Sequence, residues 1–564
     1  MSYLGYNLKM ELIDKLAKQL NITLEFNNDI DKGHLVSKDA FLRAKKQGKQ
    51  AFEVASEIVN SLTVDESVIS KIEAVSPGFI NIFLTDEFLL GALESVGAKQ
   101  DRTCGVREKI IVEYTDPNPF KVFHIGHLLP NIIGQAFSNI YEYLGKDVKR
   151  VCYQGDVGMH VAKAIYGIKE LGGTSFVINN SLSERADFLG KAYVLGSNAF
   201  DESDKVKEQV KVLNKKIYEK DPEILQDYEL GRKWSLEKFE EIYKRLGTKF
   251  DHYYFESDTA KVGLEVVEEG LEKKVFEESE GAIVYKGEKE GLHTRVFVNS
   301  EGLATYEAKE LGLAKTKYND FKYDKSIIVT GSEINEYFNV LISALCKLYP
   351  ELGKKTKHIG HGMLTLTTGK MSSRKGNVIF GEDLLNMAKD KILDVVATRQ
   401  DLSKAEKAKI AEQVAMSAVK YMVLKPKTGM GIIFDINESV RYDGNSGPYL
   451  QYSVVRANSV LNKIQIATGA VWVAPVAISD MEKELILKLM QFNETIFQCT
   501  ENYSTHYLSN YLFELASLFS GYYARVKIDE GQDTKGYRIS LLQKFVGTMT
   551  TGLSLLGIQV PEKM

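Results

Sequence analysis

The chain has 564 residues, an apolar fraction of 44%, a charged fraction of 26% and a formal net charge of −4. These values are typical of a folded protein of several domains, and the balanced charge gives no global indication of nucleic-acid binding. No apolar run approaches the roughly 18 to 20 residues of a membrane helix, and the N-terminus lacks a signal-peptide pattern, so we expect a cytoplasmic protein without a membrane partner.

The cysteines and the lysines add two local observations. The four cysteines are far apart in the sequence, so we expect reduced thiols and neither a structural zinc site nor a disulfide framework. Residues 354–377 carry six cations and no acidic residue, and this basic stretch is a candidate for contact with a polyanion. The residues concerned are Cys104, Cys152, Cys346 and Cys499, and Lys354, Lys355, Lys357, Lys370, Arg374 and Lys375.

The first part of the chain, residues 1–105, mixes amphipathic helix with the strand-like stretch PGFINIFL at residues 77–84. This pattern predicts a small α+β domain. From Lys109 the pattern changes to a buried strand (IIVEY), a helix over residues 128–144 and a second strand (VKRVCY). This βαβ unit predicts a doubly wound, Rossmann-like parallel sheet, whose ligands bind at the carboxyl ends of the strands.

Residues 172–290 are charged and mostly helical, and strand-like segments resume at RVFV and SIIVTG. We interpret the helical stretch as an insertion that joins two half-sheets of a catalytic domain over residues 106–400. Ser403 and Glu406 form a capping box, and residues 401–564 are predicted to be an all-α bundle. Its many tyrosines are either core or a stacking surface for bases, and core is the more common role. The class is therefore α/β, in a multidomain chain.

Residues 124–127 spell HIGH at the start of the helix that follows the first sheet strand. Gly126 lets a nucleotide lie against the backbone, and the helix N-terminus offers free N–H groups and positive potential. The imidazoles of His124 and His127 can donate to phosphate oxygens where charge builds up. The alternative is a pair of histidines that only caps the helix, which the position of the motif disfavours.

The second motif, KMSSRKGN at residues 370–377, lies between the strand-like stretch HGMLTL and a helix that Glu382 and Asp383 open. A loop with three cations can close over a triphosphate, because each lysine acts as a compact point charge. A solvated basic loop without a ligand is the alternative. Its pairing with HIGH on the opposite half-sheet favours nucleotide binding.

HIGH followed by a KMSKS-like loop resembles the class I aminoacyl-tRNA synthetases, and VEYTDPNPFKVFHIGHLLPNIIG at residues 112–134 narrows the resemblance to arginyl-tRNA synthetase. SPGFIN at residues 76–81 resembles that family's N-terminal domain, which reads the tRNA D-loop. GNSGPYLQYSVVRA at residues 444–457 resembles the entry to its anticodon-binding bundle, and the tail LSLLGIQVPEKM its C-terminus. The order of these matches carries the resemblance.

The resemblance implies a set of site residues, and arginine chemistry agrees with the pocket, because a guanidinium needs carboxylates and oriented acceptors. Tyr306 and Glu310 are spaced to share one helix face. The implied catalytic residues are Lys121, His124, Gly126, His127, Lys370 and Lys375; ATP contacts are His124, Gly126, His127, Lys370, Met371, Ser372 and Arg374; arginine contacts are Glu113, Asn118, Tyr306 and Glu310; tRNA contacts are Phe79, Asn81, Tyr449 and Gln451.

The sequence departs from the family pattern at several positions. Glu310 stands where aspartate is usual, and Ile334 stands where a glutamine commonly helps to fix the amino acid. Val157 replaces a usual tryptophan in GDVG, and LPN at residues 129–131 replaces R-S-T after HIGH. Either local repacking or a divergent branch explains these changes.

The reaction implied by the resemblance uses ATP with Mg²⁺: the arginine carboxylate attacks the α-phosphorus, pyrophosphate leaves, and a tRNA ribose hydroxyl then accepts the arginyl group. The protein positions groups and stabilises charge, and a monomer is expected. The alternatives are a synthetase for another charged or polar amino acid, a non-catalytic tRNA-binding relative and a small-molecule nucleotidylyltransferase. The last would not need a helical bundle, and a silent relative should have lost HIGH or Lys370.

Overall fold

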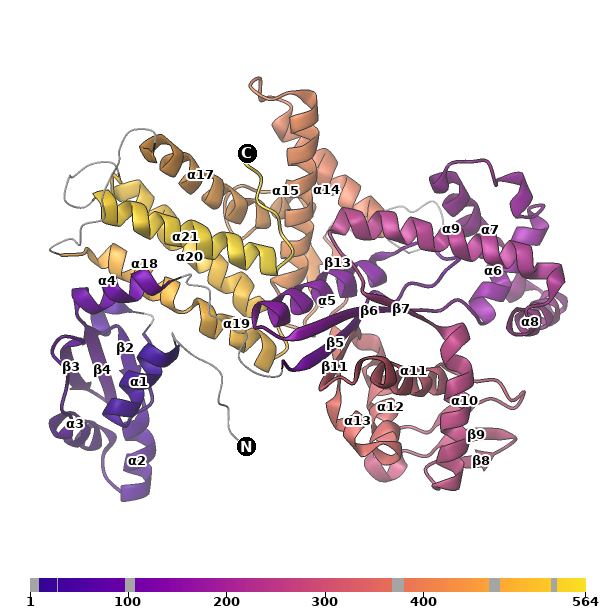
Figure 1. Ribbon diagram of the computed structural model, residues 1–564, viewed down its shortest axis with the longest axis horizontal. Helices are drawn as coiled ribbons and strands as arrows, with labels where there is room; N and C mark the ends of the chain where they lie inside the picture. The colour runs from indigo at the N-terminus through magenta and orange to yellow at the C-terminus, as the bar shows by residue number, and fades with distance from the viewer. Residues whose placement is uncertain (1–9, 28, 97–106, 368–379, 466–476, 529–534) are drawn as a thin grey trace. The chain divides into compact units, whose positions relative to one another are not determined.

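The computed structural model describes residues 10–27, 29–96, 107–367, 380–465, 477–528 and 535–564. The chain forms two compact units, one made of residues 106–440 and the other of residues 1–105 together with 441–564 (Figure 1). Each unit has its own sheet and its own buried core.

A five-stranded parallel sheet in the order β12-β11-β5-β6-β7 organises the unit 106–440. The chain runs outward from β5 through β6 to β7 and then returns to the other side of β5 with β11 and β12. The strand order therefore reverses between β5 and β11, where open α/β sheets bind ligands. This confirms the predicted doubly wound α/β class. The strands are β5 (Lys109–Tyr114), β6 (Asp147–Gln154), β7 (His252–Phe255), β11 (Lys325–Gly331) and β12 (Thr356–His361).

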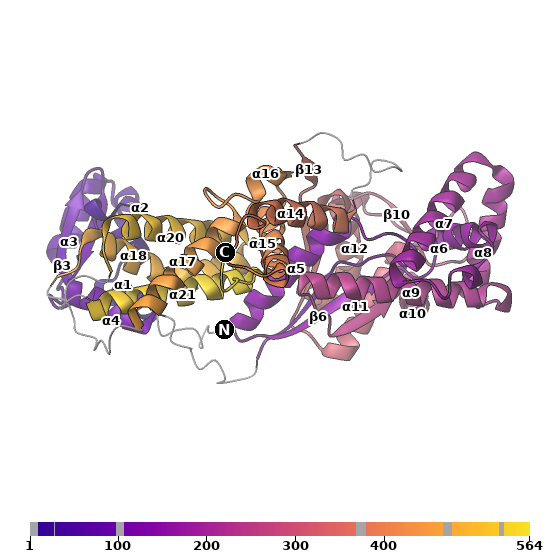
Figure 2. The same cartoon turned by 90° about the horizontal axis from the view of Figure 1, so that it is seen from above.

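The helix that carries HIGH, α5, packs closely on β5 because Gly134 has no side chain; a Cβ there would overlap the Tyr114 ring. Its other neighbours include α14 and α15 (Figure 2). The helices of this unit outside the predicted insertion are α5 (Ile125–Tyr143), α6 (Met159–Glu170), α11 (Tyr306–Phe321), α12 (Asn335–Leu348), α13 (Pro350–Lys355), α14 (Gly381–Val396), α15 (Lys404–Leu424) and α16 (Ile436–Ser439).

The predicted insertion over residues 172–290 is largely helical, with α7 (Leu182–Glu202), α8 (Asp204–Glu219), α9 (Pro222–Leu246) and α10 (Glu256–Glu272). Two details of that prediction were wrong. The range also contains β7, which belongs to the central sheet, and RVFV forms β10 (Arg295–Val298) in a separate antiparallel sheet with β9 (Ala282–Tyr285) and β8 (Glu277–Ser279). An alternating pattern identifies a strand but not its sheet, because the apolar side of the strand can be buried against any apolar surface. In β10, Phe297 packs with Phe276 and Tyr285.

The predicted capping box at the start of α15 is present: Glu406 N donates to Ser403 Oγ at 3.3 Å, and Ser403 N donates to Glu406 Oε2 at 2.8 Å. This helix packs on α5 and α14 within the unit 106–440, so that unit extends beyond the predicted boundary near residue 401. Beside it, β13 (Leu364–Leu366) pairs in parallel with β14 (Ile432–Phe434). The division into domains over 1–105, 106–400 and 401–564 stays a prediction.

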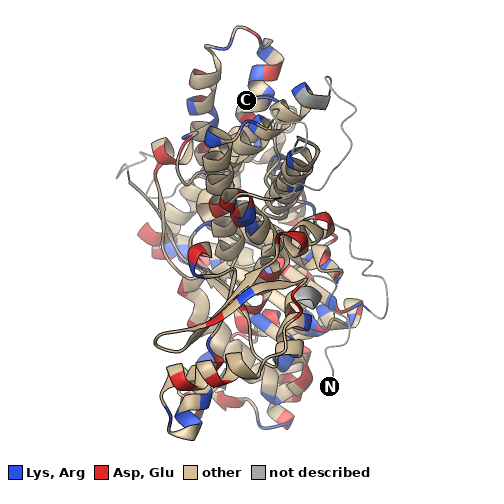
Figure 3. Cartoon of the chain, turned by 90° about the vertical axis from the view of Figure 1, so that its left-hand side faces the viewer, with Lys and Arg blue, Asp and Glu red and all other residues tan. Residues whose placement is uncertain are grey.

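The second unit joins a small α+β part to a helical bundle, and both signs of charge are interspersed over the helices (Figure 3). Its antiparallel sheet has the order β1-β2-β4-β3. The elements are β1 (Glu25–Phe26), β2 (Leu35–Ser37), β3 (Ile69–Val75), β4 (Phe79–Leu84), α1 (Met10–Leu20), α2 (Asp39–Gln47), α3 (Ala51–Ser61), α4 (Asp86–Ser95), α17 (Gly447–Gln465), α18 (Asp480–Met490), α19 (Phe492–Glu501), α20 (His506–Arg525) and α21 (Lys535–Leu555).

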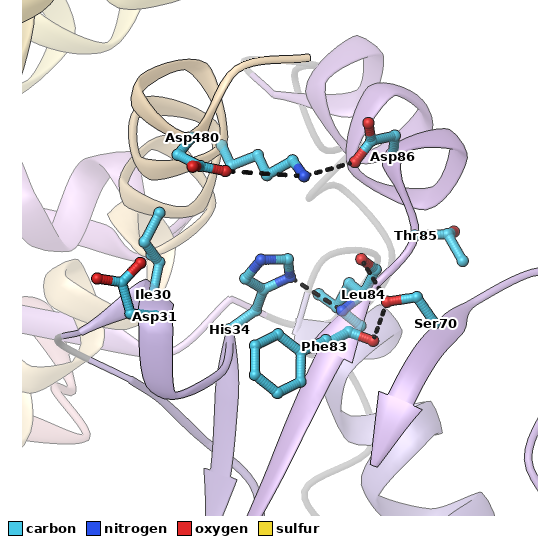
Figure 4. Close-up of a pocket in the computed structure, with 10 residues that line it drawn as sticks. Ile30, Asp31, His34, Ser70, Phe83, Leu84, Thr85, Asp86 and Asp480 are labelled. Carbon is cyan, nitrogen blue, oxygen red and sulfur yellow. Dashed lines mark hydrogen bonds and ion pairs between the residues drawn. The ribbon is translucent and has the colours of Figure 1, made fainter. Parts of the chain in front are cut away.

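Helix α4 of the small part packs on α18 of the bundle. Beside this contact lies a cavity of about 530 Å³ (Figure 4). Lys483 Nζ lies 3.0 Å from Asp86 Oδ1 and 4.0 Å from Asp480 Oδ1. The ring of His34 accepts a hydrogen bond from Leu84 N at 2.9 Å, and burial lowers its pKa. The residues that line this cavity all come from the second unit.

Candidate active site

The two histidines of HIGH close the N-terminus of α5. His124 is the N-cap residue, and its Nδ1 accepts a hydrogen bond from Gly126 N at 3.0 Å. His127 Nδ1 accepts from His124 N at 3.4 Å, so each ring satisfies a backbone N–H at the start of the helix. A ring nitrogen that accepts such a bond carries no proton. The neutral form of each imidazole therefore bears its proton on Nε2, which remains able to donate to a ligand.

Both rings are neutral at physiological pH. They stack with their centroids 3.8 Å apart. Burial, together with the Lys121 ammonium, lowers the pKa of His124 to about 4. Burial and the neighbouring His124 hold the pKa of His127 well below its usual range. The capping role that the sequence left as an alternative is thus present, and it is compatible with catalysis because capping uses only Nδ1.

Gly126 is exposed at the first turn of α5. A Cβ at this position would lie 2.9 Å from both Cε1 and Nδ1 of His124, closer than a Cβ atom approaches a non-bonded atom in folded proteins. Glycine therefore allows the His124 ring to reach the backbone N–H of residue 126. It also leaves this exposed turn without a side chain.

The loop between β5 and HIGH has a constrained backbone. Thr115, Asp116 and Phe120 have φ values of 83°, 45° and 68°, in the left-handed region that β-branched and bulky residues rarely adopt. Contacts from other elements hold this conformation: Tyr153 N donates to Asp116 Oδ1 at 2.7 Å, and Phe120 N donates to Ser235 Oγ at 2.8 Å. Strain of this kind persists only where the surrounding structure imposes it, and it concentrates at functional sites.

Glu113, at the end of β5, forms a buried ion pair with Lys317 of α11. Lys317 Nζ lies 2.5 Å from Glu113 Oε2, and both side chains are 2% exposed. Burial alone would lower the pKa of Lys317, but the Glu113 carboxylate outweighs it and the pKa is raised. The carboxylate predicted to bind a guanidinium therefore already has a cation of the protein beside it.

Two further carboxyls lie close to this pair. Loss of hydration and the negative charge of Glu113 raise the pKa of Glu310 well above its usual value, and the same two causes raise the pKa of Asp116. In the part of the chain that the structure describes, neither carboxyl has a cationic side chain within 4 Å. The cluster is therefore short of positive charge, and a cationic ligand would relieve it.

A second buried ion pair borders the acidic cluster. Lys309 Nζ lies 2.7 Å from Glu256 Oε2, and it lies 5.2 Å from the ring centroid of Tyr306. Glu256 and the amide oxygen of Asn118 both approach Gly155, where a Cβ would meet them. Asn118 and Glu256 thus meet at the carboxyl end of β6. Tyr306 is 55% exposed at the start of α11.

Lys121 lies three residues before HIGH. Its Nζ lies 5.1 Å from the ring centroid of Tyr193, and its charge lowers the pKa values of His124, His127 and His160. The ammonium therefore lies near the imidazoles.

The second motif lies outside the described residues, and so do its members Lys370, Met371, Ser372, Arg374 and Lys375. The residues that follow it are described. Phe380 forms a β-bridge with His124, and Gly381 N donates to Phe123 O at 3.1 Å. The exit of this segment is therefore fixed directly beside HIGH.

Comparisons with known proteins agree with this geometry. The model for tRNA synthetases class I (R), catalytic domain, matches residues 91–436; that for the arginyl tRNA synthetase N terminal domain matches residues 7–84; and that for the DALR anticodon binding domain matches residues 450–564. The chain belongs to the arginyl-tRNA synthetase family. The arginine–tRNA ligase of Bacteroides fragilis is 30% identical, over 93% of this chain and 92% of that protein.

Other relatives extend over nearly the whole length. The arginine–tRNA ligase of Fusobacterium nucleatum is 29% identical over 98% of this chain and 96% of that protein. The structure of the Thermus thermophilus arginyl-tRNA synthetase covers 99% of this chain and 100% of that one, with a TM-score of 0.80 and 23% identity. At that identity the likeness shows the fold.

The departures from the family pattern fall mainly at packed positions. Val157 is 3% exposed and packs with Phe120 and Val161, while Leu129 and Asn131 are buried in α5. These three residues therefore lie in the interior, where Asn131 also forms side-chain hydrogen bonds with Thr115 and Thr248. Ile334 is different: it ends a short 3-10 helix after β11 and is 38% exposed.

The four residues predicted to contact tRNA have different environments. Phe79 is half-buried beside Phe41, with the ring centroids 5.1 Å apart, and Tyr449 is half-buried beside Phe513. Asn81 is 5% exposed in β4. Gln451 is fully buried and donates to Gln559 O at 2.5 Å. Burial disfavours a direct RNA contact by Asn81 or Gln451, since their side chains do not reach the surface.

Among the bundle tyrosines, Tyr511 and Tyr522 are buried. These two tyrosines are therefore part of the core of the bundle and not of a surface on which bases could stack.

The sequence analysis did not identify Lys317 or the pair of Glu256 with Lys309. A signal for Lys317 was present, because it follows Glu310 by seven residues and therefore lies on the helix face that Tyr306 and Glu310 share. No comparable signal links Glu256 to Lys309, since they lie on different helices.

Several absences hold for the described residues alone. Within them, no helix is long and apolar enough to cross a membrane. The same residues contain no group of three or more His, Cys, Asp or Glu side chains arranged to hold a metal ion. Cys152, Cys346 and Cys499 are free thiols, and Cys104 lies outside the described residues.

Proposed function

We propose that this protein ligates arginine to its tRNA, using ATP to form arginyl adenylate. The observation that carries the proposal is the meeting of two features at the switch point of the sheet. A helix N-terminus presents two neutral imidazoles with free Nε2–H donors, and beside it an acidic cluster has more carboxyls than cations. The first feature suits a phosphate and the second suits a guanidinium.

Arginine binding rests on the acidic cluster. Glu310 and Asp116 supply the negative charge that pairs with the guanidinium. Glu113 contributes less, because it shares its charge with Lys317. Asn118 supplies an oriented neutral acceptor, and Tyr306 covers the site from the start of α11. The planar guanidinium can donate hydrogen bonds to several of these oxygens at once, in a fixed geometry that the lysine ammonium lacks.

Adenylation places the arginine carboxylate in line with the α-phosphorus of ATP. As pyrophosphate leaves, negative charge grows on phosphate oxygens next to α5, and the Nε2–H groups of His124 and His127 can donate to them. Lys121 adds positive charge, and Gly126 leaves the backbone approachable. The protein thus acts by positioning and charge stabilisation, without a nucleophile of its own.

The KMSSRKGN segment completes the ATP site in this proposal. We give Lys370, Met371, Ser372, Arg374 and Lys375 the task of closing over the triphosphate, on the strength of the motif and of its exit beside His124. Magnesium enters with ATP as the counter-ion of the triphosphate, and no protein ligands are proposed for it.

Transfer follows when a ribose hydroxyl at the 3′ end of the tRNA attacks the carbonyl carbon of the adenylate, which breaks the mixed anhydride and releases AMP. For tRNA binding we propose Phe79 in β4 and Tyr449 in α17, the two half-buried members of the predicted set. Asn81 and Gln451 support these elements from inside. Phe79→Ala should weaken tRNA binding and leave the KM values for arginine and ATP unchanged, with Phe41→Ala as the matched control for lost ring packing.

The test of the activity is ATP–pyrophosphate exchange with each of the twenty amino acids, with and without tRNA. Only arginine should support efficient exchange when its tRNA is present. Exchange with lysine or glutamine at a comparable rate would contradict the proposal. Lysine is the sharpest comparison, because it has the same charge without the planar fork.

A further inference from the structure

Asn131, on α5 about one turn after HIGH, connects the constrained loop after β5 to the end of helix α9. Its Nδ2 donates to Thr115 Oγ1 at 2.9 Å, and its Oδ1 accepts from Thr248 Oγ1 at 2.7 Å. Asn131, Thr115 and Thr248 are 1%, 3% and 7% exposed, so water does not compete for these bonds. An amide suits this place because it can donate from one end and accept at the other.

The two hydrogen bonds of Asn131 form a bridge from Thr115 to Thr248, and its Thr248 end is itself fixed. Gly247 ends α9 in the left-handed conformation, with φ of 70°, and Thr248 N donates to Tyr243 O at 2.9 Å. From α15, the buried Lys420 donates to Leu246 O at 2.6 Å. Thr248 therefore lies in a turn that hydrogen bonds from α9 and α15 hold in place.

The Thr115 end of the bridge lies in the strained loop of the site. Thr115 has a φ of 83°, which is costly for a β-branched residue, and it stands between Glu113 and Asn118 of the arginine pocket. A change of φ at residue 115 would redirect Asp116 and Asn118 relative to the end of β5. The bridge therefore acts where a small backbone change has the largest effect on the pocket.

We propose that Asn131, braced by Thr248, is a positioning residue that holds the 115–118 loop in the conformation that binds arginine. Neither residue reaches the substrate, so the effect is indirect. The inference rests on the proposed function, because it concerns the arginine pocket of that activity. It predicts that breaking the bridge weakens arginine binding selectively and leaves the ATP side of the site unchanged.

The experiment removes one hydroxyl at constant shape. Thr248→Val should raise the KM for arginine about three- to tenfold, the range expected for one lost hydrogen bond, with the KM for ATP unchanged. Thr248→Ser restores the hydroxyl and should return the KM for arginine to the wild-type value. Ser138→Ala is the matched control. It also removes a buried hydroxyl, but one that lies on α5 and donates to Gly134 O rather than to Asn131.

A double variant separates positioning from simple loss of stability. Thr115→Gly removes the acceptor of the bridge and makes a positive φ inexpensive, so Thr248→Val should add nothing to the KM for arginine in that background. Denaturant midpoints and calorimetric binding of arginine are measured for all variants. If Thr248→Val leaves arginine affinity unchanged, or if Ser138→Ala raises the KM equally, the inference is wrong. If the wild-type protein itself neither binds nor exchanges arginine, the proposed function fails instead.

Discussion

Lys317 Nζ and Glu113 Oε2 form an ion pair at 2.5 Å in which both side chains are almost fully buried. Glu113 is the residue that the family resemblance implies as an arginine contact. Its charge is thus shared between a permanent partner on α11 and any bound guanidinium. This pairing changes what substitutions in the pocket should do.

Glu113→Gln should destabilise the fold as well as weaken arginine binding. Removing one partner leaves Lys317 charged and buried, a loss of about 3–5 kcal/mol in the free energy of unfolding. Lys317→Met alone should cost a similar amount, whereas the double variant should recover most of the loss because neither member of the pair is left charged without the other. Urea unfolding of the four proteins decides this; a Glu113→Gln variant as stable as wild type would show that the pair is not buried in solution.

Glu310→Gln should act on arginine binding without that structural cost. No cation of the described residues lies within 4 Å of Glu310, so its neutral form relieves repulsion from Glu113 and the folded state should be unchanged or more stable. Losing a charge-assisted contact of about 2–5 kcal/mol should raise the KM for arginine about 30-fold or more. Glu310→Asp keeps the charge and is the matched variant. Equal KM values in Glu310→Gln and wild type would exclude Glu310 from the pocket.

Arginine binding should depend on pH through the raised pKa of Glu310. Loss of hydration and the charge of Glu113 raise that pKa, Asp116 and Glu256 add to the shift, and Lys317 opposes it. Below the raised pKa the carboxyl is protonated and cannot pair with a guanidinium, so the KM for arginine should rise as pH falls through it. Folding without arginine has the opposite sign: the contribution of this group is lost as pH rises through the folded-state pKa.

The control for this pH dependence is Glu310→Gln, which should flatten the profile. Exchange rates over a series of arginine concentrations at each pH give the KM directly. An unchanged slope in Glu310→Gln would assign the titration to another group, with Asp116 next in line because its pKa is raised for the same reasons.

His124→Asn should reduce catalysis while keeping the start of α5 intact. Asparagine is a good N-cap residue, so the helix keeps a side-chain acceptor for its first N–H groups, but the Nε2–H donor is gone. The expected loss is about 10²–10³ in kcat for adenylate formation, with little change in the KM for arginine. His124→Ala loses the cap as well and should be less stable by about 1 kcal/mol. Similar kcat values for His124→Asn and wild type would leave His124 with a capping role only.

The acid limb of the rate profile gives a second check on the histidines. Because the pKa of His124 is lowered to about 4, its protonation cannot cause a fall in rate near neutral pH.

Sequence patterns predicted the elements of the central sheet well where a strand and its helix are contiguous. Residues 109–154 form β5, α5 and β6 as expected, because strand, glycine stop and helical periodicity all agree there. The same patterns misplaced RVFV and overlooked β7, since the choice of sheet depends on contacts between segments far apart in the chain. Burial also separates the residues predicted to contact tRNA, which no motif encodes: Phe79 and Tyr449 are half-buried, whereas Asn81 and Gln451 are buried.

The sequence by itself determined the family, the α/β class and the presence of HIGH at a helix start, because these depend on local order and on motifs with a fixed spacing. Only the tertiary structure decided which atoms of the site are available. It uses Nδ1 of both histidines for capping, so that Nε2 carries the proton. Among the described residues it pairs Glu113 with Lys317 and places no cationic side chain within 4 Å of Glu310. It also brings Asn131 into hydrogen-bond contact with Thr115, whose backbone is strained. The ion pair and the Asn131 contact join side chains far apart in sequence that share one desolvated space, and no local pattern encodes such neighbours.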